Sequence, residues 1–332
     1  MSSDEVEDAI AACNLLPGPA STQLAIYCAW RLRGRAGAIV GGLAFIVPGF
    51  LLILALSALF LASSPPDWVR GAGAGAGAAV AAVAVHAGLQ LVPASRKRAH
   101  RWRWWVYAAA GAASAATIGP WLVLVLLGCG AVELAVRRVT VGGVAAIAPA
   151  AVATGGLASL AWVAFKVGAL SYGGGFVIVP LMQNDAVSRY HWLTGGQFLN
   201  AVALGQVTPG PVVLTVAAVG FAAFGVGGAL LATAVAFAPS FAFVLVGGSR
   251  FDRIRRDERA RTFLDGAGPA AIGAILGSAI PLARALHEPW QFGVLAGAAV
   301  VLLALRRGVV LTLVAAGVVG VVVALAGGPL PR

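Results

Sequence analysis

The sequence predicts an all-α polytopic membrane protein made of two homologous repeats of inverted topology, with broken or re-entrant helices at two Pro-Gly-Pro triplets. The 332 residues are 60% hydrophobic and 11% charged, with a mean hydropathy of +0.92. A soluble domain carries about twice that charged fraction. The triplet occurs at 17–19 and again at 209–211. Basic loops flank equivalent segments on opposite sides in the two halves, which indicates the inversion.

Apolar segments long enough to cross or nearly cross a bilayer follow one another along the chain. They cover 36–62, 71–92, 104–118, 121–136, 157–182, 226–249, 266–286, 290–305 and 308–327. Two further segments, 5–30 and 195–222, are mixed in polarity, and each contains one triplet. Proline lacks an N–H and clashes with the preceding turn, so these two segments cannot be continuous helices. Irregular backbone at membrane depth requires surrounding protein or a water-filled cavity, which predicts broken or re-entrant hairpins.

The formal net charge of +11 raises the question of nucleic-acid binding. The arginines, however, gather between apolar segments, at 31–35, 96–103, 137–138 and 250–261. Short basic loops beside spans are what the positive-inside rule produces, so we expect these loops in the cytoplasm and no nucleic-acid partner. The predicted location is the inner (plasma) membrane, where the lipid bilayer surrounds the spans.

The two halves of the chain can be aligned. The triplets match at an offset of 192 residues, and Phe45 falls on Phe237 at the same offset. GAGAGAGAAV (71–80) then matches GAGPAAIGAI (266–275). We therefore expect a first repeat over 1–140 and a second over 141–332.

The order of charge indicates how these repeats are oriented. Arginines precede segment 36–62 in the first half but follow segment 226–249 in the second, so the equivalent helices cross in opposite directions. Inverted repeats with paired broken helices are typical of secondary transporters, whose substrate site lies near the midplane. Open backbone N–H groups and half-helix N-termini there favour an anion.

Two stretches of the second half, FKVGALSYGGGFVIVPLM (165–182) and HWLTGGQFLNAVALGQVTPGPV (191–212), resemble the chromate ion transporter family. The matching landmarks are Lys166, Tyr172-Gly173-Gly174-Gly175, Pro180, Trp192-Leu193, Gln206 and Pro209-Gly210-Pro211. The first half matches at Pro17-Gly18-Pro19, Ser21-Thr22-Gln23, Phe45 and Pro48. The resemblance implies a two-domain inner-membrane protein that moves chromate, a tetrahedral dianion similar to sulfate. It also implies efflux driven by the membrane potential or proton gradient, with chromate resistance as the result.

The first half departs from the family pattern. No counterpart of FKVGALSYGGGFVIVPL precedes the first triplet, and Asn14 stands where the second half has Gln206. Either the start codon lies upstream, or this member has lost one helix of its pseudo-symmetric site and is impaired in transport. A transporter of sulfate or another oxyanion is the other alternative. The sequence also leaves a homodimer open.

Lys166 is the first candidate for contact with the substrate. An ammonium inside a span costs roughly 2.5–3.5 kcal/mol on insertion scales, so it should face the protein interior or a cavity. There it would complement a dianion, whereas the alternative is a lysine that snorkels from near a helix end. The run Gly173, Gly174 and Gly175 after Tyr172 can form an anion-binding nest or a hinge, or it can serve helix packing.

Neutral hydrogen-bonding side chains flank both triplets and offer contacts to oxyanion oxygens. They are Gln206 and Thr208 beside Pro209-Gly210-Pro211, and Ser21, Thr22, Gln23 and, more weakly, Asn14 beside Pro17-Gly18-Pro19. Each could instead cap a broken helix end.

Two titratable residues are candidates for proton coupling. Asp185 could carry a coupled proton, or it could form a surface ion pair with Arg189 at i+4. His86 lies mid-span, where a histidine serves either a proton relay or packing. Cys13, Cys28 and Cys129 lack disulfide or metal spacing, and no two histidines share a helix face at i, i+4. We therefore expect no metal, no cofactor and no enzymatic activity.

Overall fold

The computed structural model describes residues 18–62, 64–96, 101–117, 122–137, 156–171, 177–247 and 257–331. All regular elements in these residues are helical, which confirms the all-α prediction. In chain order they are α2 (Ala20–Phe60), α3 (Asp67–Arg96), α4 (Arg101–Thr117), α5 (Leu122–Val136), α6 (Leu157–Leu170), α7 (Ile178–Gln183), η2 (Asn184–Arg189), α8 (Gly195–Val207), η3 (Val212–Leu214), α9 (Thr215–Gly247), α11 (Glu258–Arg284), α12 (Pro289–Ala299), η5 (Val300–Ala304) and α13 (Val309–Leu325).

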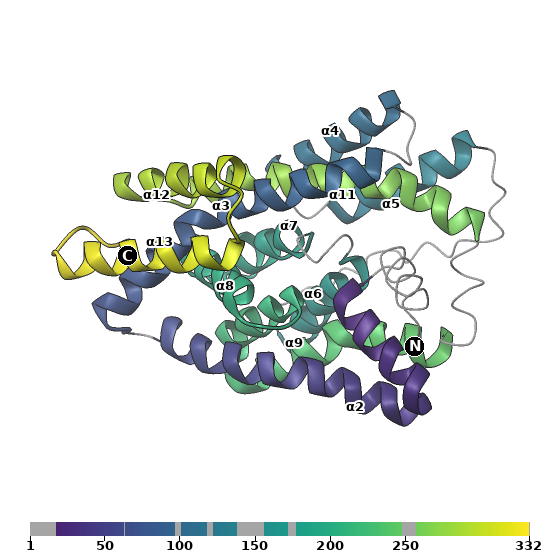
Figure 1. Cartoon of the computed structure of the whole chain (residues 1–332), viewed down its shortest axis with the longest axis horizontal. Coiled ribbons are helices and arrows are strands. Elements are labelled where there is room, and N and C mark those ends of the chain that lie inside the picture. The colour runs from purple at the N-terminus through teal and green to yellow at the C-terminus, as the bar shows by residue number, and fades with distance from the viewer. Residues whose placement is uncertain are drawn as a thin grey trace.

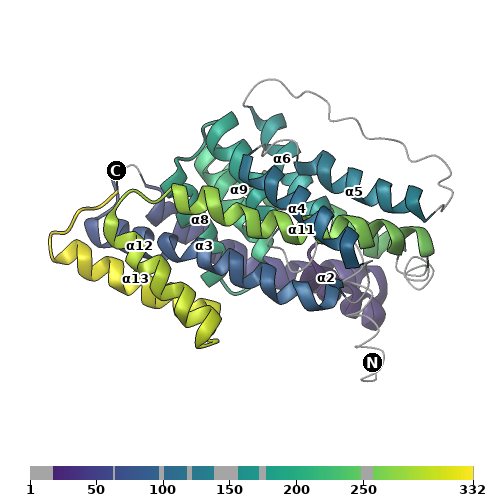
Figure 2. The ribbon, with the colours of Figure 1, turned by 90° about the horizontal axis from the view of Figure 1, so that it is seen from above.

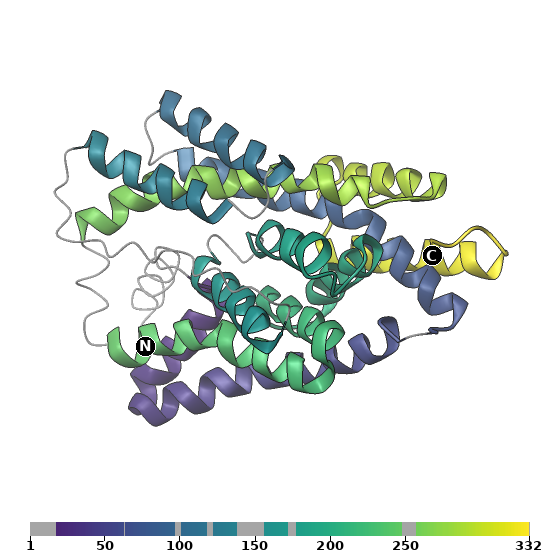
Figure 3. The ribbon, with the colours of Figure 1, turned by 180° about the vertical axis from the view of Figure 1, so that it is seen from behind.

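The long helices lie lengthwise in the molecule (Figure 1), as the view from above also shows (Figure 2). The teal α8 lies between a group that contains α4, α11 and α12 and a pair formed by α2 and α9 (Figures 1 and 3). Close packing joins α4 and α5 to α11, α12 and α13 to α3, and α6 to α9. The α3 and α11 helices also pack against each other, so they link the outer helices of the two halves.

Four helical segments of the described chain are long and apolar enough to cross a membrane. They are Ala20–Phe60, Asp67–Arg96, Val212–Val246 and Glu258–Arg284. Shorter apolar helices, among them α5, α6 and α13, lie beside them. These elements are those of a multi-pass membrane protein. In such proteins small residues let helices approach closely, and here a side chain at Gly75 would meet the backbone of α13 at Ala316.

The second triplet interrupts the chain as the sequence predicts. The α8 helix ends at Val207, residues 208–211 are non-helical, and helical structure resumes with η3 and α9. A side chain at Gly205 would collide with Thr215, so the end of α8 lies against the start of α9. A second reversal follows at Phe224 (φ −145°, ψ 29°) and Gly225 (φ 62°, ψ −151°) inside α9. The segment therefore has two hairpins, one at the triplet and one at Gly225.

The α2 helix has the same second reversal. Helical structure starts at Ala20, directly after Pro19, and reverses at Arg33 (φ −139°, ψ 22°) and Gly34 (φ 61°, ψ −148°). A side chain at Gly37 would meet the backbone of Ala29, which shows that the arms before and after the turn lie together. The predicted segment 36–62 is thus the second arm of a hairpin. The backbone angles at Arg33–Gly34 agree with those at Phe224–Gly225 within about ten degrees.

One predicted segment is wrong as a continuous span. The sequence predicts a single span over 157–182, but α6 ends at Leu170 and Ser171 is extended (φ −67°, ψ 98°). The separate six-residue helix α7 starts at Ile178. The glycine run that follows Ser171 in the sequence disfavours helix, because glycine loses more backbone entropy there than other residues. Residues 172–176 themselves lie outside the described part of the chain.

Candidate functional site

The first triplet contacts elements of the second half of the chain. We call Gly18, Pro19, Thr22 and Gln23 tip 1. Gly18 has φ +121°, a conformation that side chains disfavour, and its N–H donates to the carbonyl oxygen of Ser171 at 2.9 Å. A side chain at Gly18 would also lie 3.4 Å from the hydroxyl oxygen of Ser240 in α9. All four residues of tip 1 are buried.

The second triplet contacts the first half in return. We call residues 208–211 tip 2. Gly210 has φ +136°, and a side chain there would approach the backbone of Phe45 and Gly49 in α2. A side chain at Gly49 would lie 2.7 Å from the carbonyl oxygen of Pro209. Gly49 follows Pro48 in α2 just as Ser240 follows Pro239 in α9. Each tip therefore rests on the long helical arm of the other half, beside the proline of that arm.

Buried polar atoms that have no hydrogen-bond partner among the described residues gather at both tips. At tip 1 they are the hydroxyl oxygens of Thr22, Ser171 and Ser240; at tip 2 they are the Thr208 hydroxyl and the Gln206 side-chain nitrogen. Thr22, Ser171 and Ser240 are fully buried, and Thr208 is 5% exposed. Buried polar groups are nearly always satisfied, and each exception calls for an explanation such as a water, an ion or a functional role. These donors are suited to oxyanion oxygens.

Lys166 lies buried in α6, and its ammonium forms an ion pair with Asp185 of η2. The predicted ion pair between Asp185 and Arg189 is present, but Asp185 is 2% exposed, so its carboxylate lies in the interior and not at the surface. Arg189, one turn later, approaches the other Asp185 oxygen at 3.8 Å and is half-exposed. The snorkelling alternative for Lys166 is also wrong, because the ammonium is held inside the protein. Lys166 lies five residues before Ser171, which places the pair roughly 7.5 Å along α6 from tip 1.

The other predicted site residues do not all join the buried polar groups at the tips. Ser21 is exposed on α2 and does not join the buried hydroxyls. Pro209 and Gly210 of tip 2 are exposed, whereas Pro211 is buried. His86 hydrogen-bonds Gln90 at 2.8 Å on its own helix, and nothing in the described structure links it to the Lys166–Asp185 pair. Six predicted site residues lie outside the described residues: Asn14, Pro17, Tyr172, Gly173, Gly174 and Gly175.

Sequence reasoning missed Ser171 and Ser240. Ser171 directly precedes the predicted Tyr172 motif, and Ser240 follows Pro239, the counterpart of Pro48. The alignment of the two halves carried the signal for Ser240, since it brings AFIVPGF against AFAPSF and sets this serine beside a conspicuous proline. Ser171 had no such signal, because an isolated serine in an apolar segment is common.

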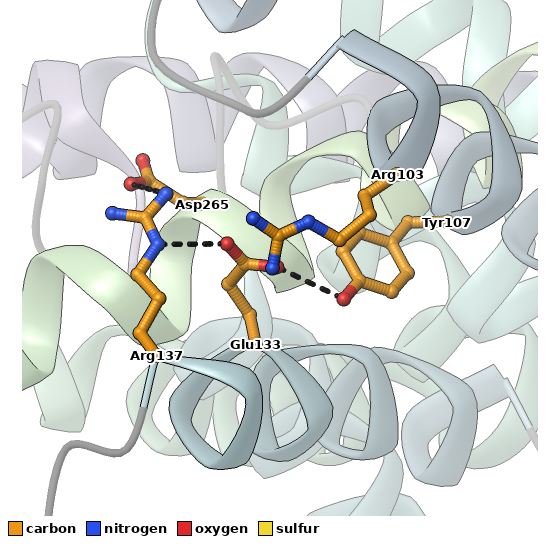
Figure 4. A network of polar contacts seen from close by, with 5 residues as sticks. All are labelled: Arg103, Tyr107, Glu133, Arg137 and Asp265. Atoms are coloured by element: carbon orange, nitrogen blue, oxygen red, sulfur yellow. Dashed lines mark hydrogen bonds and ion pairs between the residues drawn. The ribbon is translucent and has the colours of Figure 1, made fainter.

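The sequence analysis also missed a buried charged network, which joins α4, α5 and α11 (Figure 4). Glu133 is 1% exposed and accepts a hydrogen bond from the Tyr107 hydroxyl at 2.9 Å. Its carboxylate also forms ion pairs with Arg103 at 3.1 Å and with Arg137 at 2.8 Å. Arg137 in turn reaches Asp265 at 3.1 Å. A lone acid in the apolar segment 121–136 was the available signal, since such a residue needs a partner.

Known proteins resemble this chain over most of its length. The family described as chromate transporter matches residues 1–134 and 158–321, which is most of the chain. The chain belongs to the chromate transporter family. The matched residues include both tips and the Lys166–Asp185 pair. No solved structure matches.

Individual relatives agree with this assignment. The chromate transport protein of Pseudomonas aeruginosa is 31% identical over 311 residues, covering 87% of this chain and 74% of the relative. The chromate transport protein of Cupriavidus metallidurans is 31% identical over 295 residues, covering 84% and 73%. The probable chromate transport protein of Synechococcus elongatus is 30% identical over 307 residues, covering 87% and 77%. These names describe membrane transport proteins rather than enzymes.

Proposed function

We propose that this chromate transporter family member is a secondary transporter that exports chromate from the cytoplasm and thereby gives chromate resistance. The contacts between each tip and the opposite half, together with the unpartnered hydroxyls there, are the observation that carries the proposal. The arginine-rich loops favour export, because the positive-inside rule assigns them to the cytoplasm, where they attract a dianion to the inner mouth. A sulfate or other oxyanion transporter is the second candidate, since sulfate has the same shape and charge.

The proposed architecture is a pair of inverted repeats, 1–140 and 141–332. Three features support it. The reversals at Gly34 and Gly225 have nearly equal backbone angles. Both tips carry a glycine with positive φ. The packing is also exchanged: α4 and α5 lie on α11, while α12 and α13 lie on α3, as expected if a pseudo-two-fold axis relates the halves.

The proposed substrate site lies at the tips, near the middle of the membrane. Hydroxyls of Thr22, Ser171 and Ser240 donate to oxygens of the tetrahedral anion at tip 1. Thr208 and Gln206 offer equivalent contacts at tip 2. Neutral donors suit a dianion that must bind and leave, because each replaces a hydrogen bond to water without the strong attraction of a fixed charge.

Lys166 supplies the charge in this mechanism. Its ammonium is neutralised by Asp185 in the structure. A bound dianion competes for the ammonium, and Asp185 then takes up a proton or turns toward Arg189. Transport of the anion is in this way coupled to the state of one carboxylate. A fixed cation at membrane depth would otherwise hold the dianion too tightly for turnover.

Flux measurements test the proposed function. Purified protein reconstituted in liposomes should move chromate when a membrane potential or pH gradient is imposed, and should not do so without one. Sulfate should compete, and the order of competition among oxyanions identifies the preferred substrate. Absence of gradient-dependent chromate flux, with the protein intact by size-exclusion chromatography, rules out chromate export. Sulfate flux under the same conditions would support the second candidate.

A further inference from the structure

A cavity of about 460 Å³ lies away from the tips, where α3, α8 and α12 begin. Its lining includes Arg70 of α3, the amides Gln197 and Asn200 of α8, and Ser64 of the α2–α3 connection. Sites for small ligands typically measure ~300–1,000 Å³. The cavity is therefore large enough for a hydrated tetrahedral anion.

The charge of the lining favours an anion. Arg70 is the one charged side chain among the described residues that line the cavity. Its guanidinium donates to Asp67 at 3.2 Å and to the Pro331 carbonyl oxygen at 3.2 Å. Asp67 is 75% exposed, and exposed ion pairs are weak, so a dianion in the cavity can compete for the guanidinium. The amides add neutral donors beside it.

The cavity faces the side of the membrane opposite to the arginine-rich loops. It lies near the first turn of α3 and beside Ala285, just after α11 ends. The described arginines of the basic stretches, Arg96, Arg259 and Arg261, lie at the other ends of α3 and α11. Helices of 30 and 27 residues separate the two sides by roughly 40–45 Å. With the basic loops in the cytoplasm, the cavity opens on the external side.

One helix joins the cavity to tip 2. The α8 helix begins at Gly195, beside the cavity, and ends at Val207, beside Thr208. Its 13 residues span roughly 20 Å. A side chain at Gly73 would lie 2.7 Å from the Asn200 amide, and one at Gly77 would lie 3.0 Å from Leu199. The two glycines thus allow α3 to hold the first half of α8 at a fixed distance from the cavity.

We infer that this cavity is the external mouth of the translocation path and a weak binding site for the transported tetrahedral dianion. The Arg70 guanidinium and the amides of Asn200 and Gln197 hold the anion there after it leaves tip 2. The inference rests on the proposed export function, because it assigns the same anion to both places. Binding is weak and reversible, since the cavity is open to water and the guanidinium exchanges between the anion and Asp67.

Thiol labelling from outside tests the cavity independently of transport. Ser64→Cys is a conservative change in the lining, and Arg284→Cys lies on the same side at an exposed position outside it. Right-side-out vesicles are treated with a membrane-impermeant maleimide, with the wild-type chain as the background for its own cysteines. Sulfate is the probe, because it matches chromate in shape and charge but does not oxidise thiols. Sulfate should slow labelling of Ser64→Cys and leave Arg284→Cys unchanged.

The charge dependence completes the test. Adding Arg70→Gln to Ser64→Cys should raise the half-protecting sulfate concentration on the order of tenfold, the loss expected for one charge-assisted partner. Equal protection at both cysteines, no protection, or no effect of Arg70→Gln would overturn the inference, as would labelling only from the cytoplasmic side. Chromate flux is measured in parallel. Protection of Ser64→Cys by sulfate without chromate flux would support the anion site and contradict the export function. Chromate flux without protection would contradict the external site alone.

Discussion

Removal of one member of the Lys166–Asp185 pair should destabilise the protein strongly. Lys166→Met leaves the Asp185 carboxylate 2% exposed, with Arg189 at 3.8 Å as its remaining charged partner among the described residues. Breaking a buried ion pair in this way costs roughly 3–5 kcal/mol, because one charge remains buried without compensation. Asp185→Asn should cost a similar amount through the uncompensated ammonium. Either variant alone would therefore lose transport through misfolding, whatever the role of Lys166 in binding.

The double variant Lys166→Met with Asp185→Val separates stability from function. Replacement of both charges by apolar side chains of similar volume is often neutral or stabilising. Arg189 is 43% exposed and stays hydrated without its partner. We therefore expect the free energy of unfolding of the double variant to lie within about 1 kcal/mol of the wild-type value. It should clearly exceed that of either single variant. If Lys166 supplies the charge that meets the dianion, the folded double variant still does not transport chromate.

Two assays decide the outcome. Thermal unfolding in detergent, followed by size-exclusion chromatography, gives the order of stability of the four proteins. Chromate flux in liposomes, normalised to folded protein, gives the function. Wild-type flux in the double variant would refute the role of Lys166 in substrate binding. Single variants as stable as the wild type would refute the buried ion pair itself.

Three further predictions concern other parts of the fold. Glu133→Gln should cost roughly 1–3 kcal/mol, because charge-assisted hydrogen bonds to Arg103 and Arg137 are lost while both arginines stay partly exposed. Asp67→Asn on the exposed pair should cost at most about 0.5 kcal/mol, and both costs are measured by thermal unfolding. Gly210→Ala should cost roughly 1–3 kcal/mol through its positive φ, and Gly227→Ala, which meets no atom within 4 Å, should be neutral or stabilising. Ser240→Ala should fold normally but raise the chromate concentration for half-maximal flux roughly three- to tenfold, and unchanged flux kinetics would exclude this hydroxyl from the site.

Much of the fold could be predicted from composition and from the prolines. The chain breaks at 208–211 and resumes helix directly after Pro19, because proline has the same local effect in any context. Lys166 was identified for a physical reason that also holds in the structure: an ammonium in an apolar segment must have a partner inside the protein.

The partners themselves could not be read from the sequence. Lys166 and Asp185 are 19 residues apart in the sequence. They meet because α6 ends at Leu170 and a separate helix, α7, begins at Ile178. The sequence therefore suggested a surface pair between Asp185 and Arg189, which satisfied a local helical spacing. Glu133 is a similar case, because Arg103 and Tyr107 come from another helix, α4, and local spacing offered only Arg137.

The exchanged contacts of the tips have a mechanical consequence. Tip 1 is held by Ser171 and Ser240, and tip 2 rests on Gly49, so neither triplet is positioned by its own half alone. A rotation of the first half relative to the second must therefore move both tips at once. Tip 1 moves with the first half to which it belongs, and tip 2 moves because it rests on α2. A single rigid-body movement then changes the substrate's surroundings on both sides of the membrane together. Under the proposed transport function, the surroundings of the two tips are therefore coupled through this one rotation.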